Sequence, residues 1–479
     1  MHRSLSLAGL RALVVGLGRE GSALARYLAR HGLTVTATDL RPAARLTGDV
    51  AGLEAMGVDL VLGEHPLALL DRTDLVFASP GVPLTAPFLQ AAQGRGLPLS
   101  TESRLFCQVC PAPITGITGS SGKTTTATLA GQMLKADGRP TWVGGNIGRP
   151  LIGDADSIRP GDAVVMELSS FQLEYFHPAL NRGAQPVATA IQPLLKGWSP
   201  PIAAILNVTP NHLDRHGGMQ DYIRAKRAIM EYQKPEDNII LNLDDEVTRS
   251  MKPDCAGQVT WFSRRERVER GAGLDGDRIV LRRGGGQETI CRRAEVQLRG
   301  EHNLSNVLAA CALAGAAGVT HEAMAEAITG FQGVEHRLEL VRERAGVRYL
   351  NDSIATSPER LAAALRSFDE PLILLAGGRD KHLPWDEAAR LIRQRASHLI
   401  LFGEAADLIA RAVDEAGQQE PAPGPPVQQY ATLEEAVAAA AQAARPGDVV
   451  LLSPGCASFD AFEDFAARGE RFRELVERL

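Results

Sequence analysis

Aromatic and cysteine residues are scarce in this sequence. Only 5% of its 479 residues are Phe, Trp or Tyr, and only six are Cys. So few cysteines in so long a chain exclude the dense disulfide framework of a small secreted domain. Cys107 and Cys110 form a lone pair with no second pair to complete a zinc site. We therefore expect plain thiols in a reducing cytosol.

A strong excess of charge and long apolar runs are also missing. The formal net charge is −6, which argues against a nucleic-acid-binding protein with a large basic face. No run of about 18 apolar residues occurs, so no membrane span is expected. The apolar stretch 5–10 ends at Arg11, too early for a secretory leader. We expect a cytoplasmic protein with neither nucleic acid nor membrane as a partner.

The composition is that of a globular α/β protein. Hydrophobic residues make up 44% and charged residues 23%, and a chain of this length holds about three domains at ~150 residues each. Segments 11–16, 34–39, 59–63 and 74–79 are typical of short buried strands, and 22–31 is apolar at helical spacing. This alternation predicts a parallel sheet covered by helices.

Two further regions continue the alternation. From residue 102, an apolar run at 112–117 precedes strands expected at 162–167 and 203–208, and the polar, glycine-rich piece 264–287 is expected to form an exposed hairpin. From residue 334, strands are expected at 347–350, 372–376, 398–402 and 448–452, with Ala-rich helices between them. The proline-rich piece 418–427 predicts a loop.

A glycine-rich turn at 118–125 is the most informative motif. It follows the apolar run and opens an Ala-rich helix with Lys123 and Thr124. In such loops backbone N–H groups close on phosphate oxygens, the lysine neutralises the β- and γ-phosphates, and the hydroxyl can ligate Mg²⁺. The strict P-loop pattern requires Gly where Ile117 stands, so this loop is a variant. The alternative is a glycine turn that caps an ordinary helix.

A second glycine motif lies near the N-terminus. Gly16 to Gly21 fits G-x-G-x-x-G, Asp39 ends the next predicted strand, and Ser79-Pro80-Gly81 forms a turn on the same sheet edge. The pattern offers a helix N-terminus to a pyrophosphate and a carboxylate to a ribose or an amide. It fits NAD(P), FAD or a UDP group. Tight strand–helix packing without a ligand is the alternative.

Polar side chains follow strands of the second region. Glu167 can supply a second Mg²⁺ contact near the phosphate loop, and His212 is a plausible metal or substrate group. Lys226 by itself is typical of a solvated helix lysine. Asn303 and Asn306 share a helix face and suit an adenine edge, although Asn303 can equally cap the helix.

Three polar turns follow strands of the third region, at 351–358, 377–381 and 453–460. The carboxyl ends of parallel strands meet at one sheet edge, so these turns should form a crevice. Their hydroxyls and Lys381 suit a small anionic ligand that carries carboxylates.

These motifs together, from Gly16 to Phe465, resemble the Mur ligases of peptidoglycan synthesis. The resemblance rests on the phosphate-loop variant at 118–124 and on segments 144–148, 167–174, 207–215 and 453–460. It implies an α/β fold of three domains: a Rossmann-like UDP-sugar-binding domain (1–101), a central P-loop-type ATPase domain with a mixed sheet (102–333), and a Rossmann-like amino-acid-binding domain (334–479).

The resemblance also implies an activity. It is ATP-dependent ligation of D-glutamate to UDP-N-acetylmuramoyl-L-alanine through an acyl phosphate, giving ADP and phosphate in cell-wall synthesis, which serves cell shape and cell division. Two Mg²⁺ ions and a carbamylated Lys226 are expected, in a protein that acts as a monomer.

Residue roles carried over from the family are as follows. The UDP-sugar is bound by Leu17, Arg19, Glu20, Asp39, Ser79, Pro80, Gly81 and Asn146. The nucleotide is bound by Gly119, Ser120, Ser121, Gly122, Lys123, Thr124, Thr125, Asn303, Asn306, Arg337 and Asp352. The amino acid is bound by Thr356, Lys381, Ser458 and Phe465. The catalytic residues are Lys123, Glu167, His212 and Lys226, and the metal ligands are Thr124, Glu167, His212 and the carbamate of Lys226.

Two departures from the family leave alternatives open. Ile354 stands where the family usually has a lysine that helps to bind the nucleotide and the amino acid. A sibling ligase that adds L-glutamate or another amino acid is therefore the main alternative. An insertion of roughly fifteen residues near 181–201 has no assigned role. A folate polyglutamate synthase and an NAD-dependent oxidoreductase each account for only part of the motifs. A non-catalytic UDP- or ATP-binding regulator would be expected to have lost metal ligands, yet Lys123, Thr124, Glu167 and His212 are all present.

Overall fold

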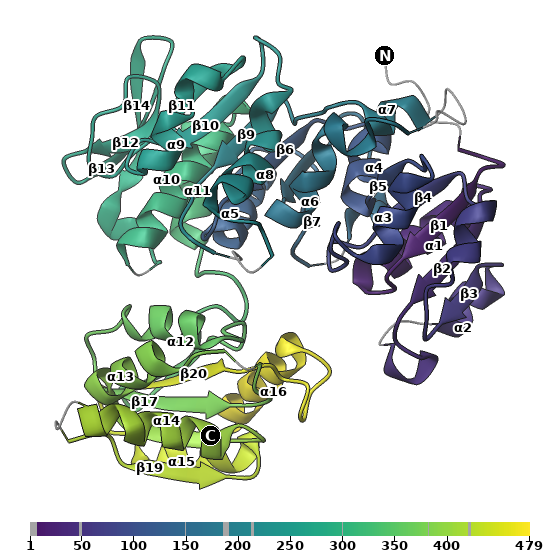
Figure 1. Ribbon diagram of the computed structural model, residues 1–479. Helices are drawn as coiled ribbons and strands as arrows, with labels where there is room; N and C mark the ends of the chain where they lie inside the picture. The colour runs from purple at the N-terminus through teal and green to yellow at the C-terminus, as the bar shows by residue number, and fades with distance from the viewer. Residues whose placement is uncertain are drawn as a thin grey trace. The chain divides into compact units, whose positions relative to one another are not determined.

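The computed structural model describes residues 7–46, 50–148, 150–184, 191–211, 215–298, 300–381, 383–419 and 423–479. The chain divides into two compact units. The first is Met1–Val296 with Glu301–Gly330, and the second is Gln297–Gly300 with Phe331–Leu479. The first unit contains two sheets and the second contains one (Figure 1).

The first sheet is parallel, with the order β3-β2-β1-β4-β5. Its strands are β1 Arg11–Val15, β2 Thr34–Asp39, β3 Asp59–Leu62, β4 Leu75–Ala78 and β5 Leu99–Ser100. Its helices are α1 Arg19–Arg30, α2 Val50–Ala55 and α3 Pro87–Gly94. Alternate residues of β1 enter two hydrophobic clusters, Val14 on the side of α1 and Leu13 on the side of α3, as expected for a sheet buried on both faces.

The second sheet is mixed, with the order β14-β13-β12-β11-β10-β9-β6-β8-β7. Strands β6 to β12 run parallel, and β13 and β14 are antiparallel to their neighbours. The strands are β6 Ile114–Thr118, β7 Thr141–Gly145, β8 Ala163–Glu167, β9 Ile202–Ile205, β10 Asn238–Asn242, β11 Gln258–Phe262, β12 Gly271–Asp275, β13 Arg278–Arg283 and β14 Gly286–Arg292. The piece 264–287 does contain a hairpin, but its strands β12 and β13 are part of the sheet and largely buried, so the expectation of an exposed hairpin was wrong.

Helices cover this second sheet. They are α4 Glu102–Val109, α5 Lys123–Ala136, α6 Ser170–Leu173, α7 Gln192–Leu195, α8 Met219–Glu231, α9 Glu246–Ser250, α10 Glu301–Ala316 and α11 His321–Gly330. The helices α5, α10 and α11 pack against one another. Gly122, the N-cap of α5, lies next to Asn306 near the start of α10, so the N-terminal ends of these two helices, which carry predicted site residues, are close together.

The apparent insertion is tied to the first sheet. Of the segment 181–201, residues 185–190 lie outside the described residues, and the rest includes α7. The side chain of Asn181 accepts from the amide of Leu99 at 2.8 Å and donates to its carbonyl at 3.0 Å. Arg104, fully buried, donates to the carbonyls of Pro193 and Lys196. The insertion therefore braces the edge strand β5 and helix α4.

The second unit has one sheet, with the order β15-β16-β20-β17-β18-β19. Its strands are β15 Glu339–Arg344, β16 Val347–Asn351, β17 Leu372–Gly377, β18 Ala396–Phe402, β19 Val427–Tyr430 and β20 Val449–Gly455, and only β15 is antiparallel. Its helices are α12 Pro358–Leu365, α13 Asp386–Arg395, α14 Ala406–Gln419, α15 Leu433–Ala443 and α16 Phe465–Arg478. Alternate residues of β17 pack toward α12–α14 or toward α15 and α16.

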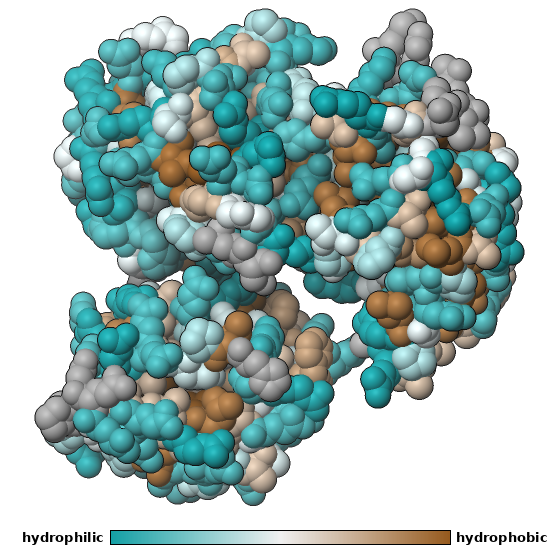
Figure 2. Space-filling model, in the orientation of Figure 1, coloured by the Kyte–Doolittle hydropathy of each residue, from teal (hydrophilic) through white to brown (hydrophobic). Residues whose placement is uncertain are grey.

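The surface and the cysteines complete the description. The face in view is mainly hydrophilic with scattered apolar patches (Figure 2). Among the described residues, no helix is long and apolar enough to cross a bilayer. All six cysteines are free, and only Cys255 is not buried.

Candidate active site

A pocket of about 400 Å³ opens in the first unit, where turns of the first sheet meet the segment after β7. Its lining is Gly16, Gly18, Arg19, Glu20, Asp39, Arg41, Ser79, Pro80, Gly81, Val82, Gly145, Asn146, Gly148 and Pro150. Of the residues predicted to hold a UDP-sugar, only Leu17 is not part of this lining; its side chain is buried. The close approach of α1 to the turn after β1 needs Gly21, because a Cβ there would lie 1.9 Å from the Gly16 carbonyl oxygen.

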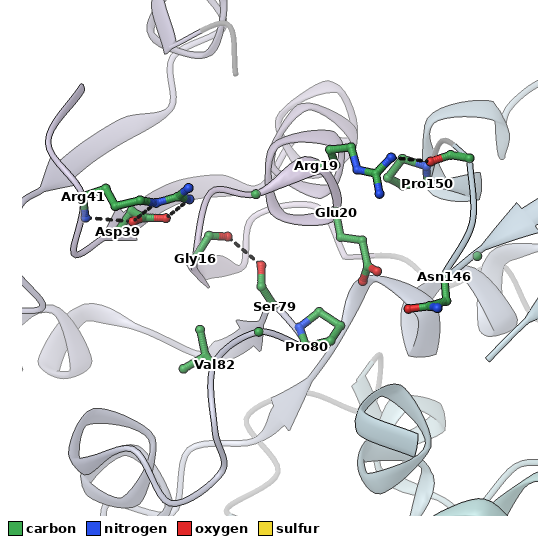
Figure 3. Close-up of a pocket in the computed structure, with 14 residues that line it drawn as sticks. Gly16, Arg19, Glu20, Asp39, Arg41, Ser79, Pro80, Val82, Asn146 and Pro150 are labelled. Atoms are coloured by element: carbon green, nitrogen blue, oxygen red, sulfur yellow. Dashed lines mark hydrogen bonds and ion pairs between the residues drawn. The ribbon is translucent and has the colours of Figure 1, made fainter. Parts of the chain in front are cut away.

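One end of the pocket is formed by Asp39 and Arg41 (Figure 3). The two side chains make a bidentate pair at 3.0 and 2.9 Å, and the Leu17 amide donates to Asp39 Oδ2 at 2.8 Å. Burial alone would raise the pKa of Asp39, but these hydrogen bonds outweigh it and lower the pKa to about 2. This end therefore presents a fixed carboxylate beside a guanidinium. Arg41 was not among the candidates; its only sequence signal is its place two residues after Asp39.

Glu20 lies in the middle of the pocket, between the Ser79–Pro80 turn and Asn146 (Figure 3). Its Oε1 accepts from Gln172 at 3.1 Å, and its Oε2 is buried with no partner in the described chain. Burial raises the pKa of Glu20, and the nearby charge of Glu102 raises it further. A neutral carboxyl at this place can donate a hydrogen bond into the pocket and does not repel an anionic ligand.

The opposite end of the pocket reaches the phosphate loop through Asn146. Strands β7 and β8 are parallel, with Gly145 paired to Glu167 at their ends, so the residue after Gly145 lies beside that carboxylate. Asn146 Nδ2 donates to Glu167 Oε1 at 2.8 Å, and Thr124 Oγ1 donates to Glu167 Oε2 at 2.9 Å. A single carboxylate therefore joins the pocket to the start of α5.

The phosphate loop is held by the loop that follows β9. The amide of Ser121 donates to Asn207 Oδ1 at 2.9 Å, and the amide of Thr209 donates to Ser120 Oγ at 3.0 Å. Lys123 Nζ donates to the Gly119 carbonyl at 3.0 Å, so the lysine folds back over its own loop. The loop is thus braced before any phosphate arrives, with a cation at its centre.

The start of α10 packs against the phosphate loop where Asn306 lies next to Gly122. Gly122 has φ +81°, and a Cβ on it would lie 2.2 Å from Asn306 Oδ1. Asn306 Nδ2 donates to Asn303 Oδ1 at 3.1 Å. The structure therefore brings the predicted amide pair to the phosphate loop, whereas the side chain of Thr125 turns into the core.

Lys226 is buried rather than solvated. It lies on α8, 1% exposed, and its Nζ donates to the Gly119 carbonyl at 2.9 Å. Burial lowers the pKa of Lys226 well below its usual value, and the charge of Lys123 lowers it further. Its amine is therefore biased toward the neutral, nucleophilic form. The prediction, made from this residue by itself, that Lys226 is a solvent-exposed helix lysine is wrong.

Arg215 is a site residue that sequence reasoning missed. Its guanidinium donates to the carbonyl of Pro80 at 2.8 Å and that of Gly81 at 3.3 Å, and it stacks on Phe171 with 4.6 Å to the ring centroid. It connects the segment after β9 to a turn that lines the pocket. His212, predicted three residues earlier, lies outside the described residues.

The second unit places its predicted residues at the carboxyl ends of β16, β17 and β20. Lys381 Nζ donates to Thr356 Oγ1 at 3.1 Å, and Ser453 Oγ donates to Asp352 Oδ2 at 2.8 Å. Burial raises the pKa of Asp352 to about 7. Arg337 lies in the turn before β15, Ser458 is buried in the segment after β20, and Phe465 begins α16.

Arg468 holds these segments together. It is fully buried and donates to Ser353 Oγ and O at 3.0 Å each, to Cys456 O at 3.1 Å, to Ala457 O at 3.3 Å and to Gly377 O at 3.5 Å. One guanidinium therefore fixes the end of β17 and the turns that follow β16 and β20. Burial lowers the pKa of Arg468 to about 10, which still leaves it charged at neutral pH.

The first unit offers a place for a hard cation. Mg²⁺ prefers oxygen ligands and is usually bound by one or two carboxylates together with phosphates and water. Thr124 and Glu167 supply a hydroxyl and a carboxylate beside the phosphate loop. Among the described residues no group of three His, Cys, Asp or Glu side chains forms a metal cluster. The donor set thus fits a nucleotide-bound Mg²⁺.

Three family models match the chain. They describe a Mur ligase MurD-like N-terminal domain over residues 10–100, a Mur ligase middle domain over 117–314 and a Mur ligase glutamate ligase domain over 336–456. The three matches follow the three sheets in order.

Named relatives and solved structures agree with these matches. The chain is 44% identical to a UDP-N-acetylmuramoylalanine--D-glutamate ligase of Symbiobacterium thermophilum, over 98% of each chain, and 42% identical to one of Roseiflexus sp., over 99% of each. It is similar in fold to UDP-N-acetylmuramate-alanine ligase MurC from Thermotoga maritima, with TM-score 0.59 and 18% identity over 98% of this chain and 99% of that one.

Proposed function

The chain belongs to the Mur ligase family, and on that premise we propose that it is the ATP-dependent ligase that adds D-glutamate to UDP-N-acetylmuramoyl-L-alanine in peptidoglycan synthesis. The products are the amide, ADP and phosphate. The observation that carries the proposal is the shared carboxylate of Glu167. It accepts a hydrogen bond from Asn146 in the pocket and another from Thr124 at the phosphate loop. A ligase that activates a bound carboxylate with ATP needs these two sites in contact.

The pocket gives the UDP-sugar a direction. The Asp39–Arg41 end suits the uridine, because a fixed carboxylate accepts from ribose or imide groups. The glycine turn at the start of α1 and a protonated Glu20 suit the diphosphate. The alanyl carboxylate then lies toward Asn146, beside the phosphate loop. Leu17, Arg19, Ser79, Pro80 and Gly81 complete this proposed subsite.

The first chemical step is phosphoryl transfer. An oxygen of the alanyl carboxylate attacks the γ-phosphorus, the bond to the β–γ bridging oxygen breaks, and ADP leaves. Lys123 and the loop amides from Gly119 to Thr125 stabilise the charge on the transferred group. Mg²⁺ bound to Thr124 and Glu167 would neutralise the phosphates. Asn303 and Asn306 hold the nucleotide from α10, and Arg337 and Asp352 are its proposed contacts in the second unit.

The second step forms the amide. The neutral amino group of glutamate attacks the acyl carbon, the carbon–oxygen bond to phosphate breaks, and the amine loses a proton to solvent or phosphate. Thr356, Lys381, Ser458 and Phe465 hold the amino acid. His212 remains a proposed group near the reacting carboxylate. The proposal includes three domains, 1–101, 102–333 and 334–479, which the presence of one sheet in each supports. It also includes a monomer that acts in the cytoplasm.

Carbamylation of Lys226 is part of the proposal. A carbamate forms when a neutral amine attacks CO₂ and the nitrogen releases one proton to solvent, and the depressed pKa of Lys226 favours the neutral amine. The product is an anion beside Gly119 that can ligate or orient metal. Incubation with ¹³C-bicarbonate should give a carbamate carbonyl signal in the NMR spectrum. The same signal in the Lys226→Arg variant would contradict the assignment.

The test of the overall reaction is phosphate release from ATP with Mg²⁺ and UDP-N-acetylmuramoyl-L-alanine. Release should require D-glutamate, and L-glutamate or no amino acid should give background. Preference for L-glutamate would favour the sibling ligase suggested by Ile354. No release with any amino acid would refute the substrate assignment.

A further inference from the structure

Arg360 is a cation beside the proposed amino-acid site of the second unit, and it is not one of the residues assigned to that site. It lies in the first turn of α12, and its Nη1 donates to the carbonyl of Ile354 at 3.1 Å. The amide of Thr356 donates to the same carbonyl at 2.8 Å. The guanidinium therefore lies against the turn that carries Thr356. Its remaining N–H groups are available to donate hydrogen bonds to a ligand.

Lys381 reaches the same turn from the end of β17. Its Nζ is 3.1 Å from Thr356 Oγ1. Burial lowers the pKa of Lys381, and the charges of Arg360 and Arg468 lower it further. Three cations thus share one locality at the carboxyl ends of the strands.

Two carboxylates of the unit act on this locality, Asp352 on Arg360 and Asp460 on Arg468, but among the described residues neither forms an ion pair with Arg360 or Lys381. In the described chain, neither Arg360 nor Lys381 has a carboxylate within ion-pair distance, and Arg468 donates only to carbonyls and a hydroxyl. The buried carboxyl of Asp352 is occupied by Ser453 and the Leu338 amide. Other arginines of the unit are paired, as in Arg348–Glu370, Arg379–Glu404, Arg471–Glu434 and Arg473–Glu339. Unpaired neighbouring cations are stabilised when an anion binds between them.

We propose that Arg360 binds a carboxylate of the amino-acid substrate, acting beside Lys381 at the Thr356 turn. A guanidinium can hold a carboxylate through two parallel hydrogen bonds, which a lysine cannot. The proposal rests on the proposed function, because it takes glutamate as the amino acid. It assigns Arg360 a direct role in binding the ligand rather than a role in folding, since its side chain is exposed and has one hydrogen bond to the protein.

The test compares KM values for the three substrates in the full-length protein. Arg360→Gln keeps a donor for the Ile354 carbonyl but removes the charge, so KM for D-glutamate should rise about tenfold or more. KM for ATP and for the UDP-sugar should stay within about twofold. Arg360→Lys should recover part of the loss. The matched control is Arg366→Gln, at the other end of the same helix, where the arginine contacts Glu387; it should behave as the native protein.

Three outcomes would overturn the assignment. A glutamate KM in Arg360→Gln within about twofold of native removes the proposed contact. An equal rise in all three KM values indicates a general structural role. Absence of glutamate-dependent phosphate release by the native protein refutes the proposed function itself, and the role of Arg360 falls with it. Native activity with an unchanged variant KM refutes only the role of Arg360.

Discussion

The buried guanidinium of Arg468 offers the sharpest test of how the second unit is built. Replacement by Met keeps most of the volume but removes every donor, so the carbonyls of Cys456, Ala457 and Ser353 lose their partner. Each buried acceptor left unpaired costs ~1–3 kcal/mol. Removal of a buried cation offsets part of this, because its desolvation is itself costly. We expect a net loss of about 2–4 kcal/mol in the free energy of unfolding.

Calorimetric unfolding measures this loss. In a domain of about 150 residues, 1 kcal/mol shifts Tm by ~2–4 °C, so Arg468→Met should lower the transition of the second unit by about 5–15 °C. The matched control is Arg471→Met on the same helix, where the arginine makes half-exposed ion pairs with Glu434 and Glu474; such pairs contribute ~0–1 kcal/mol. A Tm of Arg468→Met equal to that of the control would refute the reasoning. A lower Tm should be accompanied by a higher KM for glutamate, since the turns after β16 and β20 lose their common hydrogen-bond donor.

Three further outcomes are expected. Gly122→Ala should raise KM for ATP about tenfold or more in the phosphate-release assay, because φ is +81° and the new Cβ meets Asn306; an unchanged KM for ATP would contradict this. Arg215→Gln should raise KM for the UDP-sugar about five- to twentyfold through loss of its bonds to the pocket turn, whereas Arg224→Gln, on an exposed helix face, should not. Asp39 has a folded pKa of about 2 against ~3.9 when unfolded, so its stabilising effect is present above about pH 4 and is lost as the pH falls toward 2. In urea unfolding, the loss of stability caused by Asp39→Asn should therefore shrink as the pH falls from about 4 toward 2. A loss that stays constant over this range would count against that role.

Much of the fold follows from the sequence because the parallel strands are short, buried and nearly continuous in apolar residues. The predicted strand 34–39 coincides with β2, and 11–16, 59–63 and 372–376 differ from their strands by one residue at one end. Helix α1 begins at Arg19 rather than at residue 22, because the extended backbone at Gly18 serves as its N-cap. The predicted loop 418–427 starts too early, since α14 extends to Gln419. Edge strands such as β15 and β19 were missed because one face or edge is exposed and their sequences carry several charged or polar residues.

Fewer of the site residues than of the strands could be predicted from the sequence. Glycine turns and the Lys123–Thr124 pair have fixed spacing, so they could be recognised. Arg215, Arg360 and Arg468 could not, because each binds backbone carbonyls, and carbonyls carry no sequence signal. For Arg215 and Arg468 some of these carbonyls also come from distant segments. The reading of Lys226 failed for a related reason: its burial depends on how α8 packs against the phosphate loop.

The two hydrogen bonds to Glu167 also have a thermodynamic consequence. Asn146 belongs to the wall of the sugar pocket and Thr124 to the phosphate loop, so occupancy of either site changes the surroundings of one shared carboxylate. The affinity for the UDP-sugar must then depend on whether ATP is bound, and reciprocity requires that ATP affinity change by the same factor. The factor can be measured in two ways: from the Kd of the UDP-sugar with and without ATP, and from the Kd of ATP with and without the UDP-sugar. In Asn146→Ala, where the bridge is cut, the factor should move toward one.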